Sequence, residues 1–165
     1  MIDSQSGIMG EGLIVIAAAK EAQAGASLAH VADMARSIIP KAHVRMCFDT
    51  LEYLRKGGRI GRAQALMGSI LKVHPILGVK DGEAHPVGRE RSRAKAIERM
   101  YDFARSFDNI RGLAVEYATT PDEAEALVQR LNPIFPGNHI YVSTVSPVVG
   151  THVGPHVLAI SLLEG

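Results

Sequence analysis

The chain has 165 residues, a length typical of one domain, or of one domain with part of another. Apolar residues make up 47% of it and charged residues 21%, which supports a sizeable buried core and argues against wholesale disorder. The 18 lysines and arginines against 17 acidic residues give a net charge of +1, which argues against a nucleic-acid-binding protein.

The single cysteine, Cys47, excludes an internal disulfide framework and is typical of a reducing compartment. No apolar run reaches the roughly 18 residues that a membrane span requires. The first residues also lack the basic and apolar regions of a signal peptide. We therefore expect a cytoplasmic protein without a transmembrane segment.

Residues 1–48 have the pattern of helices and loops with little strand. Residues 1–4 resemble the end of a strand, and residues 13–19 are apolar all round, which predicts a buried helix. Ser27 is expected to cap a second helix, and residues 44–48 have the composition of a strand. Because these elements are too few for a complete α/β unit, we interpret residues 1–48 as the remnant of an N-terminal parallel α/β domain.

From residue 49 onward the pattern is that of a more complete domain. Asp81-Gly82 between two apolar runs is a strong hairpin signal, and T-P-D-E at residues 120–123 is a capping box. The order of elements predicts an α+β fold, α/β overall, in which helices pack on a mixed β-sheet. The expected elements are a short helix that ends at Gly57 and Gly58, a helical stretch at 63–71, strands at 73–79 and 84–89, a helix over 97–104, a strand at 113–117, a helix over 124–131, strands at 140–144 and 157–162, and a loop at 147–155.

Two glycine-containing segments carry most of the functional information: G-G-R-I at residues 57–60 and T-H-V-G-P at residues 151–155. Each places one cationic or proton-donating side chain, Arg59 or His152, where glycine lets the backbone approach a ligand. An arginine and a histidine near an apolar cavity suit a ligand with an acidic head and an apolar tail. Arg59 could instead cap the end of a helix, and His152 could hydrogen-bond within its own loop. The residue pattern leaves these alternatives open.

Other chemistries find little support. The remaining histidines lack metal-ligand spacing, and the chain contains no P-loop, no G-x-G-x-x-G turn after a strand and no G-x-S-x-G elbow. We therefore expect neither a metal nor a cofactor. The basic run R-E-R-S-R-A-K at residues 89–95 is either a solvated strand-to-helix junction or a docking patch for an acidic or phosphate-bearing partner.

Residues 49–60, D-T-L-E-Y-L-R-K-G-G-R-I, closely resemble the D-T-L-x-Y-L-x-x-G-G-R-I segment of DegV-type fatty-acid-binding proteins. The resemblance continues through L-K-V-H-P-I-L at residues 71–77, D-G at 81–82, R-S-R at 91–93 and T-H-V-G-P at 151–155. Essentially the whole chain is covered, in family order and spacing.

This resemblance implies a cytoplasmic two-domain carrier that buries a long-chain fatty acid between its domains. Such a carrier is not itself an enzyme: it presents the bound acid to a separate fatty acid kinase subunit, which yields an acyl phosphate. By motif position, Arg59 and His152 would hold the carboxylate, and Arg91 would face the kinase. Four further residues lie in the same segments as the carboxylate pair: Gly58, Ile60, Thr151 and Gly154.

The resemblance also shows one departure. Family members carry an N-terminal domain whose T-S-x-P-S-like loop helps to hold the carboxylate, and no such loop precedes Ile2. We therefore interpret residues 1–48 as the end of that domain and residues 49–165 as the C-terminal lipid-binding domain. Two alternatives follow. The chain could be an interaction or oligomerisation domain that no longer binds lipid and self-associates through its exposed domain face, or an enzyme that uses His152.

Overall fold

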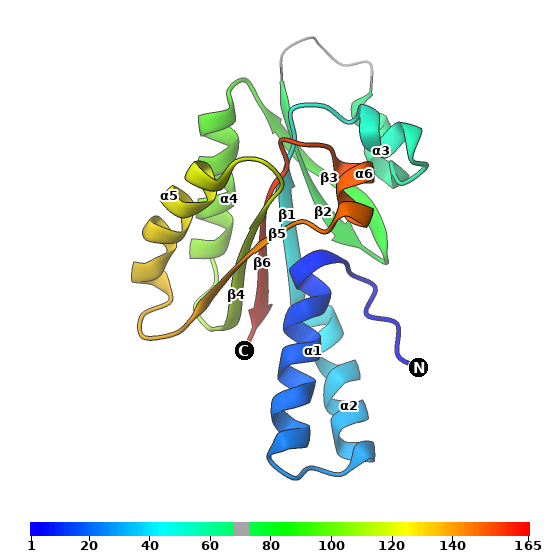
Figure 1. The fold of residues 1–165 in the computed structure, drawn as a ribbon, viewed down its shortest axis with the longest axis vertical. Helices are drawn as coiled ribbons and strands as arrows, with labels where there is room; N and C mark the ends of the chain where they lie inside the picture. Colours follow the sequence, from blue (N-terminus) through cyan, green and yellow to red (C-terminus); the bar gives the residue numbers. More distant parts are fainter. Residues whose placement is uncertain (68–72) are drawn as a thin grey trace.

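The computed structural model describes residues 1–67 and 73–165 (Figure 1). In this part of the chain the strands are β1 (Ala42–Cys47), β2 (His74–Lys80), β3 (Glu83–Glu90), β4 (Ile110–Tyr117), β5 (Ile140–Thr144) and β6 (Leu158–Glu164). They form one sheet in the order β3-β2-β1-β6-β4-β5. The β4–β5 pair is parallel and the other neighbouring pairs are antiparallel, so the sheet is mixed, as predicted.

Helices cover both faces of the sheet (Figure 1). α4 (Arg93–Arg105) and α5 (Pro121–Leu131) pack on one face. On the other face, a hairpin of α1 (Ile8–Gln23) and α2 (Leu28–Ile38) lies at one end, and α3 (Glu52–Lys56) and α6 (Pro147–Val153) lie at the other. Short 3-10 helices span Ile39–Lys41, Gly61–Leu66 and Asn132–Ile134. No helix of the described residues has the length and apolar character to cross a membrane.

The central strand β6 contributes buried side chains to the core on both faces of the sheet. Leu158, Ile160 and Leu162 belong to the cluster under α4 and α5, whereas Ala159 and Leu163 belong to clusters on the opposite face. All five are fully or almost fully buried. A strand covered on both sides needs a nearly continuous apolar sequence rather than an alternating one, and the L-A-I-S-L-L run of β6 supplies it.

The domain boundary expected between residues 48 and 49 would separate β1 from the other strands of the sheet. β1 precedes the boundary, yet it pairs with β2 on one side and with β6 on the other, antiparallel to both. β1 therefore belongs to the same sheet as the strands of residues 49–165, and its pairing does not have the parallel character expected of residues 1–48. Assignment of the remaining part of residues 1–48 to another domain stays a prediction.

Three local predictions are confirmed. Asp81 and Gly82 form the turn of the β2–β3 hairpin with φ values of 54° and 76°, as a two-residue hairpin turn requires. The Ser27 side chain accepts a hydrogen bond from the backbone N–H of His30 and caps α2. α3 ends at Lys56 with Gly57 as its C-cap, and the helix-terminating φ of +68° falls on Gly58.

Two predictions about the N-terminal part are wrong. Residues 1–4 form no strand. The apolar run of α1 has one buried face, which includes Leu13 and Ile14, whereas the side chain of Val15 is 58% exposed. The run contains alanines and a valine on the outer face, so uniform apolarity there does not require burial on all sides.

Two predictions further along the chain are also corrected. The segment expected to be a loop, residues 147–155, contains α6, which begins with Pro147 at the first helical position and Ser146 as a side-chain cap. The capping box at residues 120–123 does not form, because Glu123 is turned toward Arg93. Of the helical stretch predicted at 63–71, the structure shows a 3-10 helix that ends at Leu66, and residues 68–71 lie outside the described part.

Candidate functional site

The G-G-R-I segment forms the exit of α3. The backbone N–H of Gly58 donates to the carbonyl of Arg55, and the N–H of Arg59 donates to the carbonyl of Leu54 at 2.8 Å. These bonds satisfy the last carbonyls of the helix, and the positive φ of Gly58 makes them possible. The Arg59 side chain is exposed, and its Nη1 donates to the carbonyl of Gly57 at 3.0 Å. Arg59 therefore combines the predicted helix-end interaction with a guanidinium that has donors directed to solvent.

The T-H-V-G-P segment forms the last turn of α6 and its exit. Thr151 is exposed, and its hydroxyl donates to the carbonyl of Val148 within the helix. Gly154 ends the helix with a φ of +83°, and its N–H donates to the carbonyl of Gly150. His152 lies in this last turn and is half-buried.

The two segments meet where α3 packs against α6. A Cβ atom at Gly57 would collide with Nδ1 of His152, so glycine is what allows the imidazole to lie against the end of α3. Gly154 similarly lies against the ring of Tyr53. Within residues 1–67 and 73–165, the buried Nδ1 of His152 has no hydrogen-bond partner. The structure therefore brings the two predicted segments together and does not supply the local hydrogen bond that was the alternative for this nitrogen.

A cavity of about 240 Å³ opens beside this contact. Neither Arg59 nor His152 lines it. Its lining comes from the start of α3 and the exit of α6: Asp49, Thr50, Tyr53, Val153, Gly154, Pro155 and His156. Tyr53, which is 41% exposed, is a site residue that reasoning from charge and glycine content missed. Its position in the D-T-L-E-Y-L motif was the available signal.

An apolar cluster lies directly beneath the site. Leu54 of α3 and Val153 of α6 pack in it with side chains from β1 and β2, among them Met46 and Leu77. Ile60, predicted as a site neighbour, is half-buried against the same cluster. Polar groups at the end of α3 and α6 therefore stand at the margin of an apolar region.

An ion-pair network fixes the start of the D-T-L motif. Arg93, at the first turn of α4, is 16% exposed and binds the Glu123 carboxylate through Nε at 2.8 Å and Nη2 at 2.7 Å. Its Nη1 donates to Asp49 at 3.0 Å, and Asp49 also lies 3.1 Å from Nδ1 of His74. Arg93 thus connects α4, α5 and the residues that lead into α3. The forked guanidinium suits this double contact.

The arginines of the basic run at residues 89–95 differ in exposure because only some of them join this network. Arg93 is turned inward, whereas Arg91 is exposed at the junction between β3 and α4. Ser92 between them caps α4 by accepting from the N–H of Lys95. Arg91 is therefore presented to solvent on the same junction that holds Asp49 through Arg93.

Glu116 is a buried carboxyl that sequence reasoning missed. It lies on β4, is 4% exposed, and accepts a hydrogen bond of 2.7 Å from the backbone N–H of Met9 in the first turn of α1. Desolvation raises the pKa of Glu116 to about 7, and the bond from Met9 opposes only part of that rise. Alternation along the strand, with Glu116 between Val115 and Tyr117, gave no reason to expect burial.

The described residues contain neither an activated thiol nor a cluster of metal-binding side chains. Burial raises the pKa of the Cys47 thiol to about 12, which keeps it protonated and unreactive. Among residues 1–67 and 73–165, no three side chains of the histidine, cysteine or acidic type gather in a way that could hold a metal ion.

Comparison with known proteins places this arrangement in one family. A family model described as "Uncharacterised protein, DegV family" matches residues 1–165. A DegV domain-containing protein of Streptomyces coelicolor is 37% identical over 165 residues, which covers 97% of this chain and 58% of that protein.

Two solved structures extend the match to the fold. A fatty-acid-binding DegV family protein from Thermus thermophilus gives a TM-score of 0.87 at 29% identity, and DegV from Bacillus subtilis, a fatty acid binding protein, gives 0.85 at 29% identity. Each match covers 99% of this chain and 60% of the other. The chain spans about 58% of the length of the Streptomyces relative. On these matches, the chain belongs to the DegV family.

Proposed function

We propose that this chain forms one wall of a fatty-acid site, in which Arg59 and His152 bind the carboxylate of a long-chain fatty acid. The observation that carries the proposal is the contact between Gly57 and His152, which brings both predicted segments to one place. A buried carboxylate needs charged or hydrogen-bonding partners. The exposed Arg59 guanidinium and the His152 imidazole would supply them, with Gly58, Ile60, Thr151 and Gly154 around them.

The apolar cluster supports a place for the acyl chain. Half-buried apolar side chains extend along it from the site toward the start of α1, among them Ile60, Val149 and Ile8. Burial of a chain against such a surface contributes about 0.8 kcal/mol per CH₂ group. The solved relatives from Thermus thermophilus and Bacillus subtilis are described as fatty acid binding, which supports the same ligand class here.

We further propose that the chain acts as a carrier in the cytoplasm, with phosphorylation of the fatty acid carried out by a separate kinase subunit. Arg91 is exposed on the junction that Arg93 ties to the site through Asp49. A cation there is placed to contact an acidic partner while the carboxylate is presented nearby. Replacement of Arg91 by Glu should slow phosphorylation of the bound acid by an added fatty acid kinase without changing fatty-acid affinity. Equal rates for both proteins would remove Arg91 from this role.

Self-association is the second proposal about partners. Large apolar side chains are exposed on α1, α2, β5 and α6: Val15, Leu28, Val142 and Val148. Exposed apolar side chains favour association when they form a continuous surface. Sedimentation of the chain over a range of concentrations tests this directly, and a monomer at all concentrations would refute it.

Native mass spectrometry of the 165-residue chain with added oleate tests the fatty-acid proposal. We expect one bound oleate, and we expect Arg59→Ala and His152→Ala to reduce the bound fraction strongly. Arg36→Ala is the matched control, because Arg36 is exposed on α2 and pairs with Asp33 away from the site. It should bind oleate as the unchanged chain does.

Two other outcomes would favour the alternative functions. A chain that self-associates and takes up no oleate would be an interaction domain. Turnover of an acyl or phosphoryl substrate without an added kinase, lost on His152→Ala, would identify an enzyme.

A further inference from the structure

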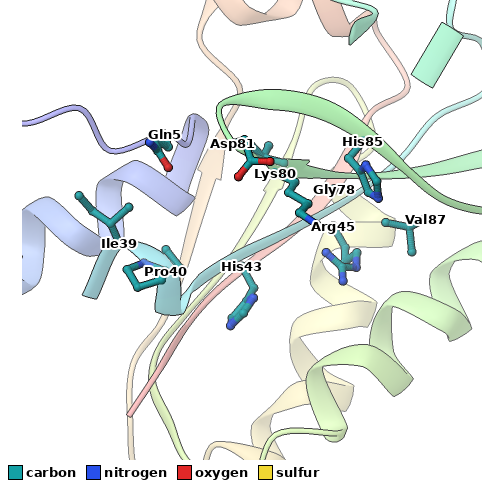
Figure 2. A pocket seen from close by; sticks show the side chains of 12 residues that line it. Gln5, Ile39, Pro40, His43, Arg45, Gly78, Lys80, Asp81, His85 and Val87 are labelled. Atoms are coloured by element: carbon teal, nitrogen blue, oxygen red, sulfur yellow. The ribbon is translucent and has the colours of Figure 1, made fainter. Parts of the chain in front are cut away.

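A second cavity, of about 510 Å³, is lined by residues of β1, β2 and β3 and of the segments before β1, and by no residue of α3 or α6 (Figure 2). Figure 2 shows Gln5, Ile39 and Pro40 at one end of it and Arg45 and His85 at the other. Its volume is within the range of small-molecule sites. Neither the glycine-containing segments nor the basic run contributes to it.

Arg45 is the principal charged group of this cavity. Its Nη1 donates to the carbonyl of Val44 at 2.9 Å, and its Cζ lies 4.0 Å from the centre of the Phe103 ring. The described residues give the guanidinium a carbonyl and an aromatic face, but no carboxylate within 4 Å; Asp102 lines a neighbouring cavity with Arg45 without forming an ion pair. Burial and the neighbouring Arg99 lower the pKa of Arg45, yet a guanidinium remains charged at neutral pH. A half-buried cation without a counter-ion is costly unless an anion joins it.

The backbone leaves room for this side chain. Gly78 stands opposite Arg45 in the β1–β2 ladder, and a Cβ there would lie 2.7 Å from Nη1 of Arg45. Gly78 also stands opposite His85 in the β2–β3 ladder. Arg45, Gly78 and His85 therefore occupy adjacent positions on one face of three neighbouring strands, with glycine in the middle.

His85 adds an unused polar atom to the same face. Its Nδ1 is buried and has no hydrogen-bond partner in the part of the chain that the structure describes. Such an atom is normally satisfied by protein, water or ligand. By contrast, His43, which also lines the cavity, lies 3.3 Å from Glu164.

The remaining charges leave the cavity positive. Lys80 and Asp81 line it as neighbours in the chain, and Asp81 is the one carboxylate among the described lining residues. Arg99 lies close enough to Arg45 to affect it but is engaged by Glu90 at 3.0 Å. Arg45 is therefore the cation in this cavity that an incoming anion would neutralise.

We propose that this cavity binds a small ligand that carries a phosphate or a similarly compact oxyanion, held by Arg45, His85 and Lys80. The guanidinium fork donates to two oxygens, His85 lines the wall beside Arg45, and the exposed Lys80 adds positive charge. The cavity is larger than an inorganic phosphate needs, which leaves room for the rest of a phosphorylated metabolite on the side of Ile39. This site is independent of the fatty-acid site.

Isothermal titration calorimetry of the 165-residue chain with orthophosphate, at constant ionic strength, tests the proposal. We expect saturable binding at one site, weakened about ten-fold by Arg45→Met because a charge-assisted hydrogen bond is lost. Lys80→Met should weaken it about three-fold. Because Lys80 is exposed, that variant keeps the test decisive if Arg45→Met does not fold. Arg36→Met is the control and should leave the affinity unchanged.

A parallel titration with a nucleoside monophosphate distinguishes the two sources of phosphate. Tighter binding than orthophosphate would identify a phosphorylated metabolite as the occupant, and equal affinity would identify the free ion. The absence of saturable binding of either probe, or the same affinity in the unchanged chain and in both cavity variants, would overturn the proposal.

Discussion

At the scale of single residues, Gly57 is the position that lets the His152 imidazole lie against the end of α3. Its missing Cβ leaves the space that His152 occupies, as the missing Cβ of Gly154 leaves space for the Tyr53 ring. This requirement follows from sterics alone, because a methyl group in place of one Cα hydrogen of Gly57 would overlap the His152 imidazole.

We predict that Gly57→Ala destabilises the chain by about 2 kcal/mol, as overpacked contacts do, and also abolishes oleate binding by displacing His152. Gly150→Ala is the matched control. Gly150 also lies in this region, inside α6, but a Cβ there would meet nothing within 4 Å. In a helix interior the alanine should stabilise the fold by about 0.5 kcal/mol. Urea unfolding and native mass spectrometry measure both effects. Equal stability of the two variants would contradict the role given to Gly57.

Glu116 makes a prediction about pH. Its pKa is raised to about 7 in the folded chain from 4.5, so the folded state holds this proton more tightly than the unfolded state does. Its effect on stability is therefore most favourable at low pH. The free energy of unfolding should fall by about 3 kcal/mol as the pH rises from 4.5 through 7, and then level off.

Glu116→Gln should remove that fall, because the amide oxygen can still accept from Met9 but does not titrate. Urea unfolding at constant ionic strength between pH 5 and pH 8 measures it. Glu125→Gln, on the exposed side of α5, should retain the fall. If the Glu116→Gln protein shows the same pH dependence as the unchanged chain, Glu116 does not bind a proton on folding.

At the scale of elements, Arg93 connects two helices with the segment that enters α3, and Arg130 provides a more exposed pair for comparison. Arg130 also binds a carboxylate with two hydrogen bonds, to Glu98 at 2.9 and 2.8 Å, but its side chain is 41% exposed against 16% for Arg93. Both contacts join α4 to α5. The Arg130 pair is more exposed to water, and its neighbours differ as well: Arg93 also binds Asp49, whereas the Arg130 Cζ lies 4.3 Å from the centre of the Tyr101 ring.

We predict that Arg93→Met costs about 2 kcal/mol of unfolding free energy, because it leaves the half-buried Glu123 carboxylate without its cation and removes one partner of Asp49. Arg130→Met should cost about 0.5 kcal/mol, as exposed pairs do. The midpoint of urea unfolding gives both values. Similar losses would contradict the larger contribution to stability that we assign to the Arg93 network.

The same element scale shows how far the sequence predicts this fold. Signals confined to a few residues succeeded: the Asp81-Gly82 turn and the Ser27 cap depend only on local backbone geometry. The capping box at residues 120–123 failed because Glu123 has a stronger partner, Arg93, which is distant in sequence. Competition of that kind is decided by tertiary packing, which a local motif does not contain.

The candidate site was predictable to a similar degree. Family resemblance placed Arg59 and His152 in two segments, and the structure places those segments in contact. The unpartnered Nδ1 of His152, the burial of Glu116 and the cavity at Arg45 depend on three-dimensional packing. Glu116 in particular has an ordinary strand position in the sequence, and its burial follows from where α1 begins.

At the scale of the whole molecule, the position of β1 determines which shortened chains can still form the sheet. It is the strand between the β2–β3 hairpin and β6, so its removal separates that hairpin from the rest of the sheet. A division of the chain at residues 48 and 49 would remove this strand. A division before Ala42 would keep it and lose the α1–α2 hairpin.

We predict that a fragment of residues 49–165 does not fold cooperatively, whereas a fragment of residues 42–165 folds with reduced stability because the cluster around Leu163 loses the cover of α1. Circular dichroism during thermal unfolding distinguishes the two. A sharp transition in the shorter fragment would show that residues 49–165 are a domain without β1.

The position of β6 has a consequence for synthesis. β6 follows every other strand in the chain, yet it lies between β1 and β4 and joins the two outer parts of the sheet. During synthesis β1 can pair with β2 early, but its other edge stays unpaired until residues 158–164 have been made. Contacts between such distant segments form slowly and leave nascent chains prone to aggregation. The nascent protein is therefore most vulnerable just before its central strand emerges, and chaperone dependence should be concentrated in that interval.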